Sequence, residues 1–216
     1  MTFRFRDRRE AGLMLAHRLG EYARRRDVLV LALPSGGVPI AEAVGRTLQL
    51  PFDVFLVRQL GVPGQEELAF GAIASGGVQM LNSGIVEAHG LTGPAIAEVA
   101  QREKRELARC ERVYRGSRPL PALRGRTVIL VDDGIAKAAG VCAALIALRH
   151  LGVATLVVAA PVIDPETHAA LQGAVDRIFA VLIPGDFSRV DDWYEDFTPT
   201  TDEAAGVLLG GSPVFS

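Results

Sequence analysis

This chain contains the segment Thr127-Val128-Ile129-Leu130-Val131-Asp132-Asp133-Gly134-Ile135-Ala136-Lys137-Ala138-Ala139-Gly140. Its first five residues are mostly β-branched and apolar, which is typical of a strand buried on both faces of a parallel sheet. Two adjacent carboxylates and a stretch of small residues follow, and then an apolar helix. The segment therefore predicts a strand, a loop and a helix of an open α/β sheet.

The position of the two carboxylates gives them a candidate function. Ligands of open α/β sheets bind outside the carboxyl ends of the strands, and the N-terminus of the next helix can hold a phosphate. Adjacent carboxylates can accept hydrogen bonds from two sugar hydroxyls, or hold Mg²⁺ directly or through water. The alternative is a solvated strand end at which an Asp caps the helix. The small residues that follow Asp132 and Asp133 favour the binding site.

The composition describes an ordinary globular protein. The chain has 216 residues, 49% of them hydrophobic, and a formal net charge of −2. This length predicts one large domain. The chain has no excess of basic residues that would indicate nucleic acid as a partner. No apolar segment approaches the roughly 18 residues that a membrane span needs. Residues 1–10 are charged and lack the apolar region of a signal peptide, so the cytoplasm is the expected location.

Several other classes of site lack their sequence signature. Cys110 and Cys142 form neither a disulfide framework nor a zinc site by themselves, and the four histidines show no ligand spacing. The chain has no Gly-x-Ser-x-Gly elbow, no Walker loop and no dinucleotide-binding glycine fingerprint after its first strand. The acidic pair is therefore the main candidate site.

Hydrophobic periodicity divides the chain into helices and strands whose first units resemble βαβ, with a right-handed parallel crossover. From residue 60 to about residue 126 the pattern changes, which indicates an insertion between strands of the sheet. Residues 184–216 show little periodicity. Helices are predicted over residues 7–25, 38–50, 94–114, 141–151 and 165–172. Strands are predicted over residues 27–33, 52–57, 68–74, 78–81, 127–131, 155–160 and 177–183.

The apolar strand, the acidic pair and the small-residue loop together resemble the binding motif for phosphoribosyl pyrophosphate (PRPP) in type I phosphoribosyltransferases. The resemblance extends across essentially the whole chain. The chain is similar to a bacterial subgroup of predicted phosphoribosyltransferases whose acceptor is generally not assigned. Its other parts are Phe5-Arg6-Asp7-Arg8, the turn Pro34–Gly37, the stretch Arg58–Gly64 and the tail segment Trp193-Tyr194-Glu195-Asp196-Phe197.

The resemblance implies the type I phosphoribosyltransferase fold, an α/β fold with a mostly parallel central sheet flanked by helices. A single domain would occupy residues 1–216. Its core would comprise about residues 1–59 and 126–183. A hood made of the middle insertion, about 60–125, and the C-terminal tail, about 184–216, would cover the carboxyl ends of the strands.

The resemblance also implies roles for individual residues. Asp132 and Asp133 would hold the ribose hydroxyls. Gly134 belongs to the same PRPP-binding loop. The 5′-phosphate would be held by Ala136, Lys137, Ala138, Ala139 and Gly140. The pyrophosphate would be bound by Ser35, Gly36, Gly37 and Arg58. In the tail, Phe187 would stack on a base, and Asp196 would join Asp132 and Asp133 at the metal. The expected cofactor is Mg²⁺, bound together with PRPP.

The sequence departs from the subgroup's pattern at three sites, all of which handle phosphate or pyrophosphate. In the phosphate loop Lys137 replaces Thr, Ala138 replaces Gly and Gly140 replaces Thr. Ser35 stands where Arg is common, and Gln59 stands where Lys is favoured. The ammonium group of lysine is a common phosphate ligand, but it could equally block the site. Losing two cationic positions would slow the transfer by several powers of ten if each is worth ~2–3 kcal/mol.

Three functions therefore stay open on sequence alone. The first is a phosphoribosyltransferase that joins a nucleobase-like or other nitrogen acceptor to PRPP and releases pyrophosphate. The second is a catalytically silent nucleotide- or sugar-phosphate-binding regulatory protein on the same fold. The third is an anion-binding scaffold that uses Lys137 as a ligand. The expected partner is a small molecule, PRPP or a nucleotide, and the exposed face of the helix at 94–114 favours a homodimer.

Overall fold

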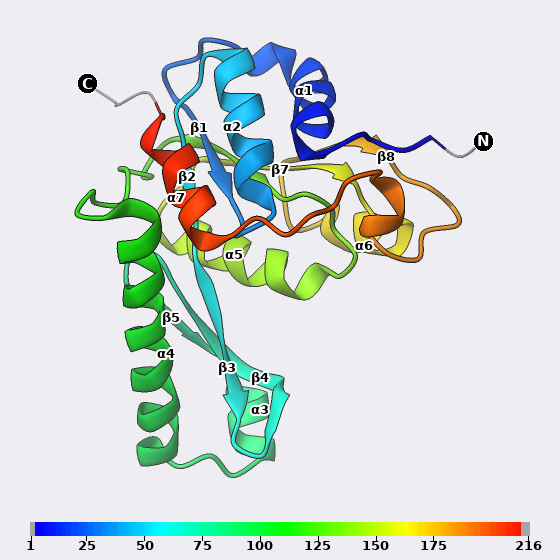
Figure 1. The fold of residues 1–216 in the computed structure, drawn as a ribbon. Helices are drawn as coiled ribbons and strands as arrows, with labels where there is room; N and C mark the ends of the chain where they lie inside the picture. The colour runs from blue at the N-terminus through cyan, green and yellow to red at the C-terminus, as the bar shows by residue number, and fades with distance from the viewer. Residues whose placement is uncertain (1–2, 213–216) are drawn as a thin grey trace.

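A computed structural model describes residues 3–212 of the protein, so residues 1–2 and 213–216 of the predicted domain lie outside the described residues. The chain forms a body and a projecting arm (Figure 1). The body is built on a five-stranded parallel sheet in the order β2-β1-β6-β7-β8. Its strands are β1 (Val28–Ala32), β2 (Phe52–Val54), β6 (Thr127–Val131), β7 (Thr155–Val162) and β8 (Arg177–Leu182). The predicted mostly parallel sheet is confirmed.

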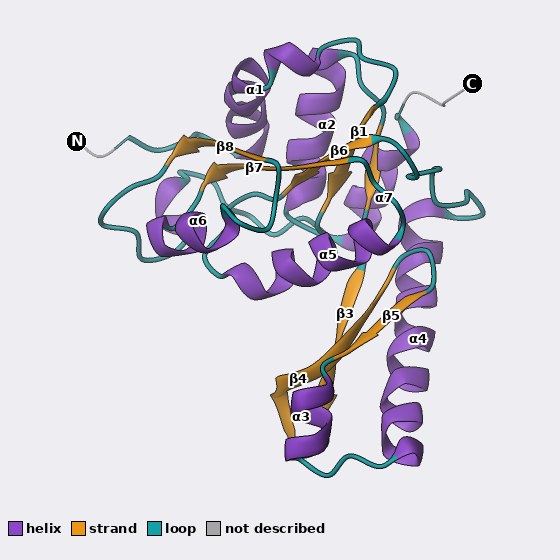
Figure 2. Ribbon diagram, turned by 180° about the vertical axis from the view of Figure 1, so that it is seen from behind, coloured by secondary structure: helices purple, strands orange, loops and turns teal. Residues whose placement is uncertain are grey.

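Helices cover both faces of this sheet, as Figures 1 and 2 show from opposite sides. One face carries α1 (Arg8–Arg18), which continues into a short 3-10 turn (Gly20–Tyr22), and α2 (Gly37–Leu48). The other face carries α5 (Ala138–His150) and α6 (Pro165–Leu171). No helix among the described residues is long and apolar enough to cross a membrane.

The apolar strands supply two separate cores because their side chains alternate between the two faces. In β1, Val28, Val30 and Ala32 enter the core beneath α1 and α2. Leu29 and Leu31 enter the core beneath α5. Every residue of β1 is fully buried. This double burial explains why the strands appear in the sequence as continuous apolar runs and not as alternating patterns.

The arm comprises residues 57–115 and extends away from the body (Figure 1). It consists of an antiparallel sheet, in the order β3-β4-β5, and two helices. The long helix α4 packs along β3 and β4. The homodimer that its exposed face favours stays a prediction. The elements of the arm are β3 (Val57–Val62), β4 (Gln65–Ala74), β5 (Val78–Leu81), α3 (Ser83–Ala88) and α4 (Gly93–Arg115).

The prediction of one continuous strand over residues 52–57 is wrong, because this segment is divided between two strands. β2 ends at Val54, and β3 begins at Val57 in a different sheet. Between them, Phe55 donates a backbone hydrogen bond to Ala32 of the body, and the Leu56 amide donates to Ser75 Oγ of the arm. Phe55 and Leu56 are both buried, so the crossing from one sheet to the other looks like one apolar strand in the sequence.

Two helices were not predicted. The first is α3, and the second is α7 (Asp202–Gly210). Thr201 caps the N-terminus of α7, where its hydroxyl accepts a hydrogen bond from the Ala204 amide. In α7 the pattern is weak because much of the helix is small and apolar, but Ala205 and Leu209 are fully buried. α7 packs against α2, β2 and α4, and so joins the tail to the base of the arm.

A buried ion pair fixes the base of the arm to the body. Arg115, the last residue of α4, donates to Asp53 Oδ1 of β2 at 3.1 Å and to the Val54 carbonyl oxygen. The side chains of Arg115 and Asp53 are 2% and 7% exposed. Arg115 also pairs with Glu111, whose side chain is 33% exposed, so Asp53 is its more deeply buried ionic partner and its removal would leave the guanidinium poorly compensated.

We expect Asp53→Ala to lower the free energy of unfolding by about 2–3 kcal/mol, since it leaves the buried Arg115 guanidinium with only the more exposed Glu111 carboxylate as its ionic partner. Glu21→Ala is the matched control, because it breaks the solvent-exposed pair with Arg177 and should cost less than about 1 kcal/mol. Urea denaturation of both variants measures the difference. Equal losses would contradict the structural importance of the buried pair.

Candidate functional site

The two carboxylates lie at the carboxyl end of β6, in the middle of the parallel sheet. Asp132 and Asp133 are both half-buried, and the Asp133 amide donates to Asp132 Oδ1 at 2.9 Å. β1 and β7 flank β6, so their carboxyl ends and the segments that follow them surround the acidic pair. This is the edge of an open α/β sheet at which ligands bind.

Arg8, at the start of α1, is the partner of Asp133. Its Nε donates to Asp133 Oδ2 at 2.8 Å, and the two side chains are only 10% and 14% exposed. A second guanidinium nitrogen donates to the Thr198 carbonyl oxygen at 2.7 Å, and the guanidinium lies over the Phe197 ring at 3.9 Å. Arg8 therefore ties the acidic pair to the C-terminal tail.

Sequence reasoning assigned no role at the site to Arg8, although a usable signal is present. Arg8 shares a helical face with Ala11, Gly12 and Leu15, at spacings of three, four and seven residues, and all are buried. An arginine on the buried face of a helix needs an anionic or polar partner. Because most of the neighbouring residues are also charged, the sequence does not distinguish Arg8 from the exposed arginines beside it.

The C-terminal tail also contacts the acidic pair directly. Tyr194 donates its hydroxyl to the Asp133 carbonyl oxygen at 2.5 Å, and its backbone lies in a bridge beside Phe5. Burial raises the pKa of the Tyr194 hydroxyl, and the Asp133 carboxylate raises it further. Tyr194 therefore stays protonated and acts as a hydrogen-bond donor.

The two carboxylates differ in their electrostatic environment. Burial raises the pKa of Asp132 well above its usual value, and the negative charge of Asp133 adds to the effect. Asp133 has the Arg8 guanidinium beside it, whereas no cation is hydrogen-bonded to Asp132 among the described residues. A carboxyl group whose pKa is raised by desolvation and by a neighbouring carboxylate is typical of functional sites.

The turn Pro34–Gly37 lies directly against the acidic pair. A Cβ placed on Gly36 would be 2.0 Å from Asp133 Oδ2, and one placed on Gly37 would be 2.8 Å from the Val131 carbonyl oxygen. The peptide bond between Pro34 and Ser35 is cis. Only glycine leaves room for this approach of the two loops. The structure thus brings Ser35, Gly36 and Gly37 beside Asp132 and Asp133.

The loop after the acidic pair is held by the segments that follow β7 and β8. Ile135 pairs with Ile163, and the Ala136 carbonyl oxygen accepts from Thr167 Oγ1 at 3.0 Å. A Cβ on Gly134 would lie 2.4 Å from a methyl group of Val190, so this glycine is also required by space. The loop is therefore short and closely packed.

The helix after this loop begins earlier than predicted. α5 starts at Ala138, so Ala138, Ala139 and Gly140 form its first turn and are not part of a loop. Ala and Gly are compatible with a helical turn, and the apolar periodicity that fixed the prediction begins only at Val141. The first amides of a helix have no partner within it and can bind an anion.

Lys137 is the residue that precedes α5. Its backbone is extended, and its exposed side chain makes no hydrogen bond or ion pair with the described residues. Around Gly140 there is open space, so a side chain could be added there without contact. A phosphate at the start of α5 would find unpaired backbone amides and one ammonium group within reach.

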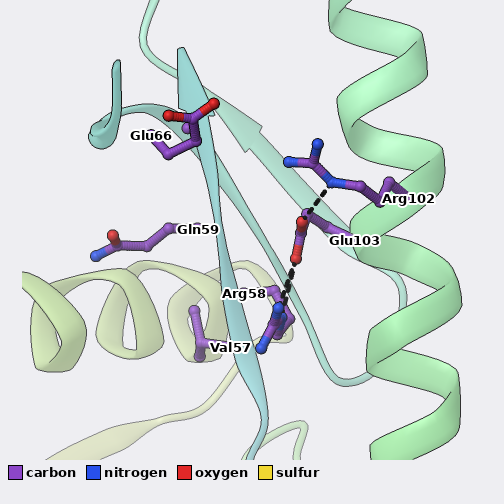
Figure 3. A pocket seen from close by; sticks show the side chains of 7 residues that line it. Val57, Arg58, Gln59, Glu66, Arg102 and Glu103 are labelled. Atoms are coloured by element: carbon purple, nitrogen blue, oxygen red, sulfur yellow. Dashed lines mark hydrogen bonds and ion pairs between the residues drawn. The ribbon is translucent and has the colours of Figure 1, made fainter. Parts of the chain in front are cut away.

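Arg58 is not at the end of a strand of the parallel sheet, as predicted, but is the second residue of β3 in the arm. It is paired with Glu103 of α4 at 2.8 Å, and Glu103 also accepts from Arg102 at 3.0 Å. Figure 3 shows Arg58 pointing toward α4, whereas Gln59 points to the opposite side of β3. Arg58, Pro34 and Ser35 still line one cleft of about 340 Å³.

The two tail residues have ordinary structural partners. Phe187 is half-buried and packs against the core on the α1 side of the sheet. Asp196 is exposed and accepts hydrogen bonds from the amide and hydroxyl of Thr198, which lower its pKa. Within residues 3–212 no three His, Cys, Asp or Glu side chains lie close enough to hold a metal ion.

The residues at 9–192 match the phosphoribosyl transferase domain family. The chain belongs to this family. It is 42% identical over 206 residues to "Putative phosphoribosyl transferase Rv0571c" of Mycobacterium tuberculosis strain H37Rv, a match that covers 95% of this chain and 46% of that protein. The same match is found with "Putative phosphoribosyl transferase MT0597" of strain CDC 1551. The chain thus spans about half the length of these curated relatives.

A solved structure extends this similarity to three dimensions. The crystal structure of TT1426 from Thermus thermophilus is 38% identical and superposes with a TM-score of 0.85. The match covers 96% of this chain and 98% of TT1426. The predicted family resemblance and the fold that it implies are both confirmed.

We expect Gly36→Ala to lower the free energy of unfolding by about 1–3 kcal/mol, because its Cβ would overlap the Asp133 carboxylate and force the turn or the side chain to move. Gly140→Ala is the matched control. It lies in open space within the first turn of α5, where alanine is the better helix former. Thermal denaturation should show a destabilised Gly36 variant and an unchanged or stabilised Gly140 variant.

We expect Asp132→Asn to raise the free energy of unfolding at neutral pH, because it removes a negative charge that the fold desolvates and places beside Asp133. The contribution of the raised pKa of Asp132 to stability is fully present below the ordinary pKa of Asp, and it is lost as the pH rises through the raised value. The gain from Asp132→Asn should therefore disappear in acid. Denaturation over a pH series measures it.

The adjacent substitution Asp133→Asn should have the opposite sign. It removes the charge that Arg8 binds, so we expect a loss of about 1–3 kcal/mol at neutral pH. The same sign for both variants would contradict the different environments of the two carboxylates.

Proposed function

We propose that the protein binds PRPP at the acidic pair and transfers its phosphoribosyl group to a nucleobase-like or other nitrogen acceptor, with release of pyrophosphate. The observation that carries the proposal is the close approach of the turn Ser35–Gly37 to Asp133. In PRPP the pyrophosphate is attached to C1 of the ribose. A site for the ribose hydroxyls and a site for the pyrophosphate must therefore be neighbours.

The third part of the proposed site is the start of α5. The 5′-phosphate is attached to the opposite end of the ribose from the pyrophosphate. The loop Gly134–Lys137 leads from the acidic pair to the unpaired amides of Ala138, Ala139 and Gly140. Lys137 supplies the positive charge that the subgroup's threonines do not carry.

The chemistry would depend on stabilising charge at both ends of the bond that breaks. As the bond between C1 and the pyrophosphate oxygen opens, positive charge develops on the ribose and negative charge on the leaving group. Asp132 and Asp133 orient the ribose, and the backbone amides of the turn together with Arg58 stabilise the pyrophosphate. The acceptor nitrogen supplies the electron pair for the new bond, so no protein nucleophile is required.

Arg8 has a positioning role in this scheme. Its guanidinium fixes the Asp133 carboxylate through the ion pair, and the Tyr194 hydroxyl holds the same residue through its backbone carbonyl oxygen. The contact with Arg8 limits the rotamers of the Asp133 side chain, and the contact with Tyr194 fixes its backbone. The ribose would then bind to a carboxylate that is already oriented, which lowers the entropic cost of binding.

The residues present fit magnesium only when the ion brings ligands with it. Asp132 and Asp133 offer carboxylate oxygens, but Arg8 already binds one of them, and no third protein ligand lies nearby among residues 3–212. Mg²⁺ is commonly held by one or two carboxylates together with substrate phosphates. When bound, it would neutralise charge on the pyrophosphate.

A second candidate function is binding without transfer. Arg58 is engaged by Glu103, and the positions of Ser35 and Gln59 lack the cations that the subgroup favours. A protein with this site could bind ribose and 5′-phosphate yet stabilise the leaving group poorly. Restoring Ser35→Arg, Gln59→Lys and Lys137→Thr together should raise a transferase activity, whereas a regulatory protein would gain nothing.

The experiment that tests the proposal is calorimetric titration with PRPP and with ribose 5-phosphate, each with and without Mg²⁺. We expect PRPP to bind with a Kd on the order of micromolar, more tightly with Mg²⁺, and at least about tenfold more tightly than ribose 5-phosphate. Asp132→Asn should abolish the binding of both ligands while leaving the protein folded. Equal affinities, or no binding of either ligand, would overturn the proposal.

A further inference from the structure

A row of four arginines occupies one exposed face of α4. Arg102, Arg105, Arg109 and Arg112 follow one another at spacings of three, four and three residues, which places them on one side of the helix. All four are exposed. Together with Arg58 of β3 they line a cleft of about 550 Å³. We call this the arginine cleft.

The negative charges in the arginine cleft do not balance these arginines. The cleft contains two acidic residues, Glu103 and Glu106. Glu103 is shared by Arg58 and Arg102, as Figure 3 shows, and Glu106 is bound by Arg109 at 2.7 Å.

Arg105 and Arg112 make no hydrogen bond or ion pair with the described residues. The cleft therefore carries an excess of positive charge, and two of its guanidinium groups are free to bind a ligand.

The stability of α4 does not explain this arrangement. Each successive pair in the row places like charges three or four residues apart, which destabilises a helix by a few tenths of a kcal/mol per pair. The helix is already secured by its buried face and by Arg115, which pairs with Asp53. The repulsion between these arginines thus destabilises the helix slightly, and a bound anion would reduce that repulsion.

The arginine cleft adjoins the cleft at the turn Pro34–Gly37, with which it shares lining residues. Arg58, Glu106 and Arg109 line both of them, and the second also includes Pro34 and Ser35. An anion in the arginine cleft would therefore reach Arg58 and would compete with Glu103 for its guanidinium group.

We propose that the arginine cleft binds a linear oligophosphate, the group that nucleoside polyphosphates and inorganic polyphosphate share. Arg102 and Arg112, at the two ends of the row, are ten positions apart, which is about 15 Å along the helix. The guanidinium groups of the row recur along that length, which matches a chain of linked phosphates better than a single compact anion. Each guanidinium can bind two phosphate oxygens at once. This site is separate from the acidic pair and goes beyond the proposed transfer reaction.

The cleft fits a small ligand better than a nucleic acid. The chain carries a net charge of −2, so it lacks the overall positive charge that concentrates nucleic acid at a surface. No aromatic side chain lines the arginine cleft to stack on bases.

The experiment is calorimetric titration of the full chain with inorganic tripolyphosphate, without Mg²⁺ and at low, fixed ionic strength. The test variant is Arg105→Gln/Arg112→Gln, which removes the two unpaired guanidinium groups. The matched control is Lys104→Gln/Arg18→Gln. It removes the same net charge from exposed side chains that do not line the cleft and that have no partner among the described residues.

We expect the test variant to weaken tripolyphosphate binding by about tenfold or more, and the control variant by less than about threefold. A nucleoside triphosphate that binds more tightly than tripolyphosphate would identify a nucleotide as the ligand, and equal affinity would identify the phosphate chain alone. Either result supports the site.

Three results would overturn the inference: no binding of tripolyphosphate, equal losses in both variants, or tighter binding of a single-stranded oligonucleotide that displaces tripolyphosphate. PRPP binding distinguishes the two proposals. If PRPP binds and tripolyphosphate does not, the oligophosphate site alone is rejected. If tripolyphosphate binds and PRPP does not, the proposed function alone is rejected.

Discussion

The ion pair between Arg8 and Asp133 is the interaction on which the arrangement of the site depends. It joins residues 125 positions apart, and Arg8 also binds the Thr198 carbonyl oxygen, 190 positions away. Through these contacts one guanidinium group fixes the start of α1, the end of β6 and the tail relative to one another. Because both side chains are largely buried, the pair is weakly screened by salt, and neither partner can be lost without leaving a charge in a poor environment.

The sheet explains why this pair can exist at all. Parallel strands with apolar side chains on both faces place the carboxyl ends of β1 and β6 next to each other, so the segments after them must share one small region. Gly36 and Gly37 make that possible, since any Cβ would collide with Asp133 or with the Val131 carbonyl oxygen. Asp132 is then enclosed without a cation of its own. The desolvated charge of Asp132 therefore lies at the position where the hydroxyl groups of a ligand could donate hydrogen bonds to it.

Sequence alone was sufficient for the parts of the fold that local pattern determines. The buried strand 127–131, the acids after it and the glycine turn were predicted because continuous apolar runs, adjacent carboxylates and paired glycines each have a direct physical meaning. The break between β2 and β3 was missed because Phe55 and Leu56 are buried on both sides of the crossing. α7 was missed because a short helix of small residues has little periodicity, and its burial depends on α2 and α4. The partners of Arg8 and Arg58 lie far away in the sequence, and no local pattern reports them.

The most direct test is a crystal structure of the protein soaked with PRPP and Mg²⁺. The account predicts ribose hydroxyls on Asp132 and Asp133, pyrophosphate against the Ser35–Gly37 turn, and the 5′-phosphate at the first amides of α5. It also predicts that the Arg8–Asp133 ion pair stays intact. Electron density for PRPP elsewhere on the molecule, with the acidic pair bound only to water, would contradict it.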